Sequence, residues 1–312
     1  MNTMSNAMPE PSGDAHVVPS AAAARTRPFF WSVRRELWEN RSIYIAPLAV
    51  AAVIVFGFLI SMVKLVDRMR DVLALDPQKQ SAAIAMPYDI AAIIVIVTSL
   101  IVAASYCLGA LHGERRDRSI LFWKSLPVSD LTTVLSKAFI PLVVLPLIAF
   151  ATVEVMQLIM RLLNTAVLLA NGMSPALLWT FGAPFEGSLV LLYGLAVTAL
   201  WYAPVYGWLL LVSGWARRAT FLWALLPPLA LCVAEAIAFH TWRFAAMLKY
   251  RLSGGFAEAF VVRGHSEGYP KVGLEQLDPV KFLTTPGLWI GLGFAAAFLA
   301  AAVWLRRNRE PI

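Results

Sequence analysis

The sequence predicts an all-α integral membrane protein with six transmembrane helices, and three observations lead to this class. The chain of 312 residues is 59% hydrophobic and only 14% charged, whereas a soluble domain is about 45–50% apolar and about 25% charged. Several apolar runs reach the roughly 20 residues that a helix needs to cross the hydrocarbon core. Apolar and polar residues do not alternate within these runs, which disfavours a membrane β-barrel.

Six runs are predicted to span the membrane. They are Ile43–Val63, Ile90–Leu111, Phe139–Leu163, Ser188–Ser213, Phe221–His240 and Pro286–Leu305. The third run contains Pro141 and Pro146, and the fifth contains Pro227 and Pro228. Prolines are tolerated inside membrane helices because neighbouring groups satisfy the carbonyls that they free.

The distribution of Lys and Arg orients these spans. Of the 26 basic residues, fifteen fall in short segments on one side: Arg25, Arg27, Arg34, Arg35, Arg41, Arg115, Arg116, Arg118, Lys124, Lys137, Arg217, Arg218, Arg306, Arg307 and Arg309. Basic residues gather in cytoplasmic loops, so both termini are predicted to be cytoplasmic, in a multi-pass protein of a bacterial-type cytoplasmic (inner) membrane. The net charge of +7 reflects this topology, and nucleic acid is not expected as a partner.

Two domains are expected, and the first is short. Residues 1–27 are rich in Ala, Pro and Ser, lack the apolar core of a cleavable signal peptide, and are predicted to be a disordered cytoplasmic tail. Residues 28–312 form the membrane domain. Cys107 and Cys232 both fall inside predicted spans and are interpreted as small packing residues.

An amphipathic helix is predicted over Pro28–Ser42, just before the first span. Phe30, Val33 and Leu37 recur at helical spacing and are flanked by tryptophans, a pattern typical of the membrane interface. Its charged side chains (Arg34, Arg35, Glu36 and Glu39) are expected to point away from the apolar face. A plain membrane anchor and a specific mechanical role are both open.

On the outer side, Lys64–Pro87 is expected to extend the first helix until Pro77 stops it. The largest external segment, 241–285, is expected to form short amphipathic helices broken at Gly254–Gly255. In the sixth span, small residues four apart (Gly287, Gly291 and Ala295) form a face that permits close helix contact.

The segment Gly113–Lys137 separates the second and third spans and combines charges with the apolar run "ILFW". Pro127 cannot continue a helix, and Ser129 is a suitable N-cap for the next one. Aromatic side chains beside charges are typical of docking surfaces, although the same rings also suit the lipid interface. The docking candidates are Glu114, Ser119, Leu121, Phe122, Trp123, Lys124, Ser125, Leu126, Pro127 and Ser129.

Glu114, Ser119 and "LFWKSLPVSD" resemble the first cytoplasmic loop of ABC-2 type transporter permeases. The six-span layout, the amphipathic helix before it and the closing "TPGLWIGLGFAAAFLAAAVWLRRNR" are similar too, so the resemblance covers most of the chain from Pro28. Arg118 departs from it, because many relatives carry Gly there, and regular helix is expected in place of a tight step. The resemblance implies a permease subunit of an ABC exporter: ATPase subunits would dock on the coupling loop 113–137, and two permease chains, identical or different, would line one pathway.

No catalytic or cofactor motif is present in the sequence. The phosphate loop G-x-x-x-x-G-K-[ST] is absent, so ATP hydrolysis is expected in a separate subunit. H-E-x-x-H and G-x-S-x-G are absent as well. The chain is therefore not expected to be an enzyme or to hold a cofactor or metal.

Glu154, Gln157 and Glu235 are candidates for a translocation path. A carboxylate inside a span costs about 2.5–3.5 kcal/mol on insertion scales, so it usually faces a cavity or a partner. Two interpretations of Glu154 are open: a structural pair with Arg161, or a polar lining near an outer exit. The alternative functions are a proton-coupled secondary transporter, in which Glu154 and Glu235 carry protons, and a membrane scaffold.

Overall fold

The computed structural model describes residues 28–117, 128–180, 184–261 and 273–308, so the predicted tail lies outside it. Six helical stretches are long and apolar enough to cross a membrane, which confirms the predicted fold class. They are Ser42–Leu73, Lys79–Arg116, Asp130–Ala170, Ala176–Trp215, Thr220–Phe239 and Pro286–Asn308. Within the described ranges, β pairing is limited to one isolated bridge between Phe260 and Leu277.

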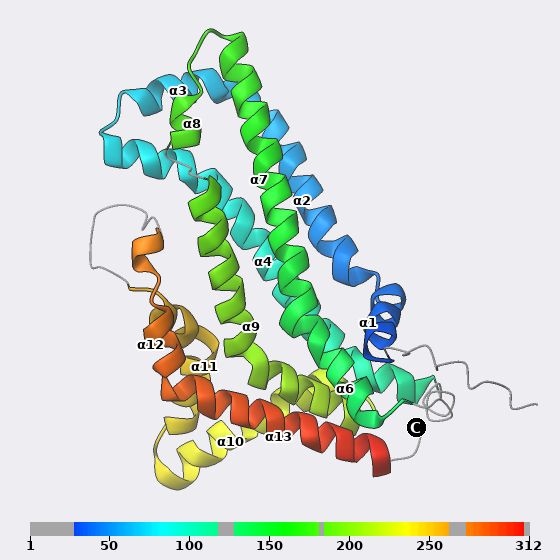
Figure 1. Cartoon of the computed structure of the whole chain (residues 1–312). Helices are drawn as coiled ribbons and strands as arrows, with labels where there is room; N and C mark the ends of the chain where they lie inside the picture. The colour runs from blue at the N-terminus through cyan, green and yellow to red at the C-terminus, as the bar shows by residue number, and fades with distance from the viewer. Residues whose placement is uncertain (1–27, 118–127, 181–183, 262–272, 309–312) are drawn as a thin grey trace, which may run out of the picture.

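Figure 1 shows the order of the elements. They are α1 (Pro28–Glu39), α2 (Ser42–Ser61), η1 (Met62–Lys64), α3 (Leu65–Leu73), α4 (Pro77–Arg116), α6 (Asp130–Phe139), η2 (Ile140–Val144), α7 (Leu145–Ala170), α8 (Ala176–Thr180), α9 (Pro184–Trp215), α10 (Thr220–Phe239), α11 (Arg243–Ala259), η3 (Leu274–Gln276), α12 (Pro279–Thr284) and α13 (Pro286–Asn308). Helix α3 continues the first span as expected, and Pro77 begins α4.

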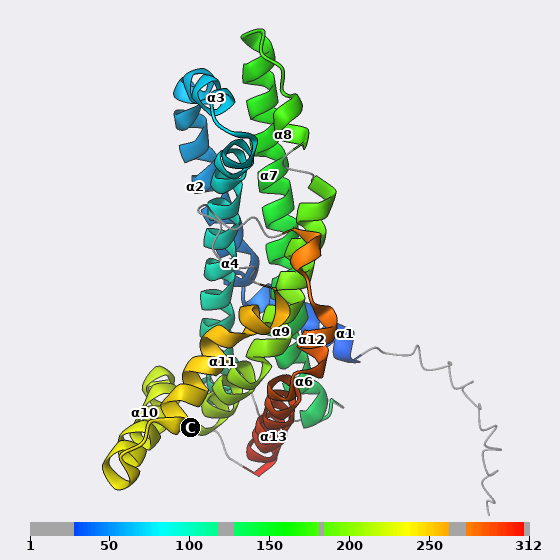
Figure 2. The same ribbon diagram turned by 90° about the vertical axis from the view of Figure 1, so that its left-hand side faces the viewer.

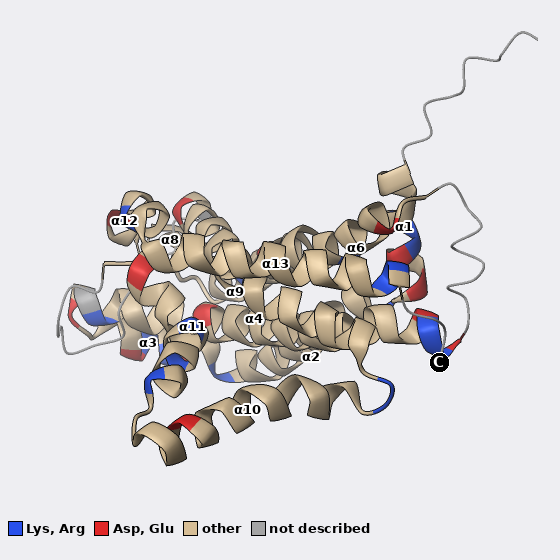
Figure 3. Cartoon of the chain, turned by 90° about the horizontal axis from the view of Figure 1, so that it is seen from below, with Lys and Arg blue, Asp and Glu red and all other residues tan. Residues whose placement is uncertain are grey.

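The long helices α2, α4 and α7 lie side by side, and α9 packs between α4 and α13 (Figures 1 and 2). Helix α10 projects from the bundle (Figure 2), and only 6% of its most apolar window is buried. Charged residues gather at the two ends of the bundle and are sparse between them (Figure 3). We call the end formed by α1, α6 and the last turn of α13 the network end.

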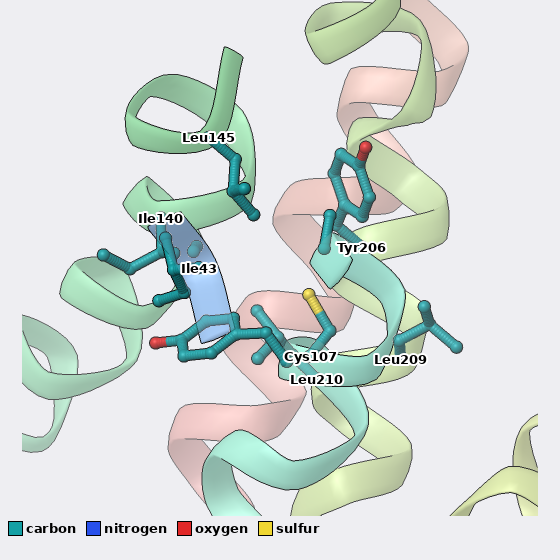
Figure 4. Packing of buried hydrophobic residues seen from close by; sticks show 10 residues of the cluster. Ile43, Cys107, Ile140, Leu145, Tyr206, Leu209 and Leu210 are labelled. Atoms are coloured by element: carbon teal, nitrogen blue, oxygen red, sulfur yellow. The ribbon is translucent and has the colours of Figure 1, made fainter. Parts of the chain in front are cut away.

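One buried core cluster close to the network end joins four spans. Ile43 of α2, Cys107 of α4, Ile140 of η2 and Leu210 of α9 are fully buried in one cluster, with Tyr206 against them (Figure 4). The Cys107 thiol lies among apolar side chains, as a packing residue would. Removing a buried Leu or Ile side chain from such a core typically costs about 2–5 kcal/mol.

A π-turn, η2, interrupts the third span where its prolines lie. Pro141 has no N–H, and its ring would clash with the carbonyl of residue 137 in a regular α-helix. The wider turn begins beside Pro141 and ends just before Pro146, and the Leu145 N–H bonds to the Ile140 carbonyl five residues back. Turns of this kind are rare and frequently mark functional sites.

The expected break at Gly254–Gly255 is wrong, because α11 runs through both residues. The glycines are needed there for close packing. A Cβ on Gly255 would lie 2.8 Å from Cγ of Trp201, and a Cβ on Gly254 would lie 2.8 Å from the Tyr250 ring. The Trp201 side chain is fully buried, and its Nε1 donates to the Arg251 carbonyl at 2.8 Å.

The small-residue face of the sixth span packs within the chain. Gly207 of α9 lies against Ala295, where an added Cβ would be 3.2 Å from the Ala295 carbonyl oxygen. At Gly291, a Cβ would overlap the Arg251 guanidinium, which donates to the carbonyls of Trp201 at 3.2 Å and Gly287 at 2.8 Å. The small residues of α13 therefore allow close contact both with helix α9 and with the Arg251 side chain.

A helix is present where one was predicted, over Pro28–Glu39, but the Glu36 side chain lies on the opposite side from the one expected. Glu36 is only 2% exposed, whereas Trp31 and Trp38 are 56% and 68% exposed. Arg34 lies over both tryptophan rings, 5.2 and 4.9 Å from their centroids. The helix thus turns an acidic side chain inward and its aromatic face outward, because the buried ammonium group of Lys137 from α6 contacts Glu36.

Candidate functional site: a buried ion network where four helices meet

Glu36 of α1 is the first centre of a buried ion network at the network end. Its Oε1 accepts a hydrogen bond from Lys137 Nζ of α6 at 2.7 Å. Its Oε2 accepts from the Tyr106 hydroxyl of α4 at 2.8 Å. Both Glu36 and Lys137 are 2% exposed, so α1, α4 and α6 are joined through charges that water does not reach.

Glu114 of α4 is the second centre, and three cations surround it. Lys137 Nζ lies 3.1 Å from Oε1, and Arg35 Nη2 of α1 lies 2.8 Å from the same oxygen. Oε2 accepts a hydrogen bond from Arg306 Nη1 of α13. Glu114 is 7% exposed, so its carboxylate is occupied inside the protein.

Arg306 extends the network to the start of α6. Its Nε lies 3.0 Å from Oδ1 of Asp130, the first residue of α6. Ser129 caps this helix, since its side chain accepts from the Thr132 N–H at 3.1 Å. The predicted N-cap is therefore confirmed, and it fixes Asp130 beside Arg306.

Each buried charge of the network is paired. Arg35, Lys137 and Arg306 face the carboxylates of Glu36, Glu114 and Asp130. Arg35 also pairs with the half-exposed Glu39 at 3.1 Å. Burying ions is expensive unless each is paired and hydrogen-bonded. Replacing one member of a buried ion pair leaves the other charge uncompensated and typically destabilises the folded protein by about 3–5 kcal/mol.

The end of α4 is also fastened to α9. Arg115 Nη1 donates to the Gly214 carbonyl at 2.7 Å. The Ser213 hydroxyl oxygen accepts from the N–H groups of Leu111 and His112 at 3.0 and 2.9 Å. Ser213 is fully buried, so these bonds hold the last turn of α4 against its neighbour.

Among the docking candidates, the structure describes Glu114 and Ser129. Glu114 is buried in the network, and Ser129 is exposed at the start of α6. The other candidates (Ser119, Leu121, Phe122, Trp123, Lys124, Ser125, Leu126 and Pro127) lie outside the described residues. The helices on both sides of them, α4 and α6, meet in the same network.

In the middle of α7, Glu154 and Gln157 line one pocket of about 190 Å³ together with Val155, Leu158, Arg161 and Trp179. Glu154 Oε2 accepts from the Ser188 hydroxyl of α9 at 2.8 Å. Gln157 Nε2 donates to the Tyr88 carbonyl at 3.3 Å. Within the described part of the chain, Glu154 and Arg161 form no ion pair. The structural pairing considered for them is therefore absent.

Glu235, the third path candidate, lies apart from that pocket. Its carboxylate accepts from the N–H groups of Arg243 and Phe244 at 2.9 and 2.7 Å and from the Thr241 hydroxyl at 2.7 Å. These N–H groups belong to the first turn of α11, where a carboxylate is favoured by unpaired donors and the helix dipole. Glu235 thus joins α10 to α11.

Sequence reasoning missed most of the ion network. From the sequence alone, Arg35 and Arg306 indicate only topology, Asp130 indicates only a helix start, and Tyr106 is part of an apolar span. One signal was available: acids as well as bases flank the predicted spans on the same side. It could not say which residues pair, because the partners lie as far as 192 residues apart in sequence.

Comparison with known proteins adds no relative: no family model, no curated protein and no solved structure matches the chain.

Proposed function

We propose that this chain is the membrane-spanning permease subunit of an ATP-binding cassette transporter, driven by a separate ATPase, with both termini in the cytoplasm. The observation that carries the proposal is the ion network. Helices α4 and α6 flank segment 118–127, and their ends are joined to each other and to α1 and α13 through Glu114 and Lys137. A force applied to that segment would reach four helices at once.

The mechanism is rigid-body transmission. Because buried ion pairs tolerate little displacement of one partner, α1, α4, α6 and the end of α13 would move as a unit. The π-turn η2 begins three residues after Lys137, where a helix interrupted by proline bends more readily than a regular one. Movement of α6 would thereby tilt α7, which carries Glu154 and Gln157 toward the opposite end.

The surface next to segment 118–127 suits a protein partner. Leu131 and Leu135 are 55% and 42% exposed on α6, one helical turn apart. Together with Phe122 and Trp123, they would present apolar anchors ringed by the charges of Arg116 and Asp117. A second permease chain would complete the pathway, and export is the direction that the family resemblance implies.

The test is co-purification of the ATPase with this chain. The tagged chain, purified from its native membrane, is expected to bring with it a subunit that carries a phosphate loop, with at least two permease chains per complex. Phe122→Ala with Trp123→Ala is expected to weaken ATPase binding about 30-fold, since a buried aromatic anchor is worth about 2 kcal/mol or more.

A matched control is the pair Phe30→Ala and Trp31→Ala, two exposed rings on α1 that touch each other. It should leave ATPase binding unchanged. Equal binding by the wild type and the Phe122/Trp123 variant would place those rings in the lipid interface. A monomer that transports without any ATPase would overturn the proposed function.

A further inference from the structure

Arg161 of α7 is a buried cation without an acidic partner. It is 9% exposed, and its Nε has no hydrogen-bond partner. Within the described residues it forms no ion pair, and its guanidinium carbon lies 5.5 Å from the centroid of the Tyr88 ring. A cation in a membrane span is costly unless something compensates it, and it usually marks a functional site.

The polar groups near Arg161 bond to one another, and Arg161 itself lines the pocket. Asn164, one turn further along α7, donates through Nδ2 to the Tyr88 hydroxyl at 2.8 Å. The buried Oδ1 of Asn164 also has no partner. Arg161 lines the cavity of about 190 Å³ described above; a water molecule takes about 30 Å³ in the liquid. There is room for an anionic group beside the guanidinium.

The position of the pocket indicates where that group comes from. Arg161 is nine residues from the end of α7, so about 13 Å along the helix axis, far from the network end. Two residues that line the pocket, Val155 and Leu158, are 58% and 50% exposed. In a membrane-spanning chain, such exposed apolar side chains meet lipid tails, and the rim near a helix end meets lipid head groups.

We propose that this pocket binds the phosphate of a phospholipid head group through Arg161, in the leaflet opposite the network end. A guanidinium holds a phosphate through two parallel N–H···O bonds. The apolar rim of Val155 and Leu158 takes the adjoining acyl chain, and the exposed Trp179 ring adds an amphipathic edge of the kind favoured at head groups. Glu154 lies in the same pocket and tunes its charge. This site does not depend on an ATPase.

The experiment is a lipid titration of the full chain in a neutral maltoside detergent, followed by thermal melting. Phosphatidylglycerol is expected to raise the melting temperature saturably, since a ligand that binds only the folded state stabilises it. Diacylglycerol of the same chain length and inorganic phosphate are expected to have little effect. An equal shift with diacylglycerol would show an apolar groove alone, and an equal shift with inorganic phosphate would show a free-anion site; either overturns the proposal.

Two variants in the pocket move binding in opposite directions. Arg161→Gln is expected to weaken phosphatidylglycerol binding about tenfold or more, because a charge-assisted hydrogen bond is lost. Glu154→Gln is expected to strengthen it, because a carboxylate near the phosphate becomes neutral. Arg70→Gln is the control, since Arg70 is 69% exposed on neighbouring α3, and it should bind as wild type does.

The melting temperature without lipid separates a binding role from a structural one. Because Arg161 loses no ion pair and only its contact with the Tyr88 ring, Arg161→Gln should melt close to wild type. A lower melting temperature, or unchanged lipid binding, would overturn the proposal. If Arg161→Gln does not fold, the proposal fails on that ground, and Arg161→Lys then measures how much of the stability depends on charge alone.

Discussion

Fully and partly buried cations are held in two different ways, one at the network end and the other away from it. At the network end, Lys137 and Arg306 are 2% and 4% exposed in their side chains and bind carboxylates. Away from it, Arg161 and Arg251 lie over aromatic rings, and Arg251 donates to backbone carbonyls. In the first arrangement, cations and carboxylates from different helices neutralise each other and hold those helices together. The second keeps positive charge available, because rings and carbonyls do not cancel it.

The largest effect is expected from Lys137→Met, which keeps the length of the side chain and removes the charge between Glu36 and Glu114. Both carboxylates remain buried with one cation fewer, so the variant should be destabilised by about 3–5 kcal/mol. Thermal melting in detergent measures the loss. Lys249→Met, at an exposed position of α11, is the control and should melt as wild type does. Equal melting of both variants would mean that the network does not hold the helices.

A double-mutant cycle sharpens the first half of the comparison. Glu36→Gln and Lys137→Met remove the two sides of the 2.7 Å pair. Residues in one buried network couple by about 0.5–3 kcal/mol, so the double variant should be more stable than the sum of the single losses predicts. Additive losses would show that the two side chains contribute independently.

A smaller effect is expected from Gly291→Ala, which tests the second arrangement. The added Cβ would displace the Arg251 guanidinium from its carbonyl acceptors. Losing hydrogen bonds to a charged group costs about 1.5–3 kcal/mol, and better helix propensity returns about 1 kcal/mol. A net loss of about 0.5–2 kcal/mol should appear in thermal melting. Gly293→Ala, where a Cβ meets nothing within 4 Å, should be neutral or stabilising, and a similar loss there would contradict the explanation.

The smallest effect is expected from Ser129→Ala. The change removes the cap that accepts the Thr132 N–H and should cost about 1 kcal/mol. Since the cap positions Asp130, the interaction between Asp130 and Arg306 should weaken too, which a cycle with Arg306→Gln measures. Ser253→Ala within α11, whose hydroxyl bonds to the Lys249 carbonyl, is the matched change without a cap. An equal loss of stability in Ser253→Ala would show that the effect of Ser129→Ala does not come from losing the helix cap.

Local physics made much of the fold predictable. An apolar run of about 20 residues leaves few options in a membrane, and all six predicted spans are present. The cap at Ser129 was predictable for the same reason, since a cap involves residues only three apart.

What could not be predicted depends on partners far along the chain. Glu36 reads as a surface charge on an interfacial helix until Lys137, 101 residues away, is placed beneath it. Gly254 and Gly255 read as a helix break until the fully buried Trp201 is packed against them. Glu154 and Arg161 share a helix face seven residues apart, yet their side chains turn to Ser188 and Tyr88 on neighbouring helices.

The π-turn Ile140–Val144 has a further consequence for how the two ends are oriented. A π-turn contains one residue more than the α-helical turn it replaces, and each residue advances an α-helix by about 100°. The extra residue therefore sets the rotational phase between Lys137, which faces the ion network, and Glu154, which lines the pocket with Arg161. Deleting one residue within η2 would rotate one of these side chains by about a quarter turn relative to the other, while leaving every charged residue of both sites in the sequence.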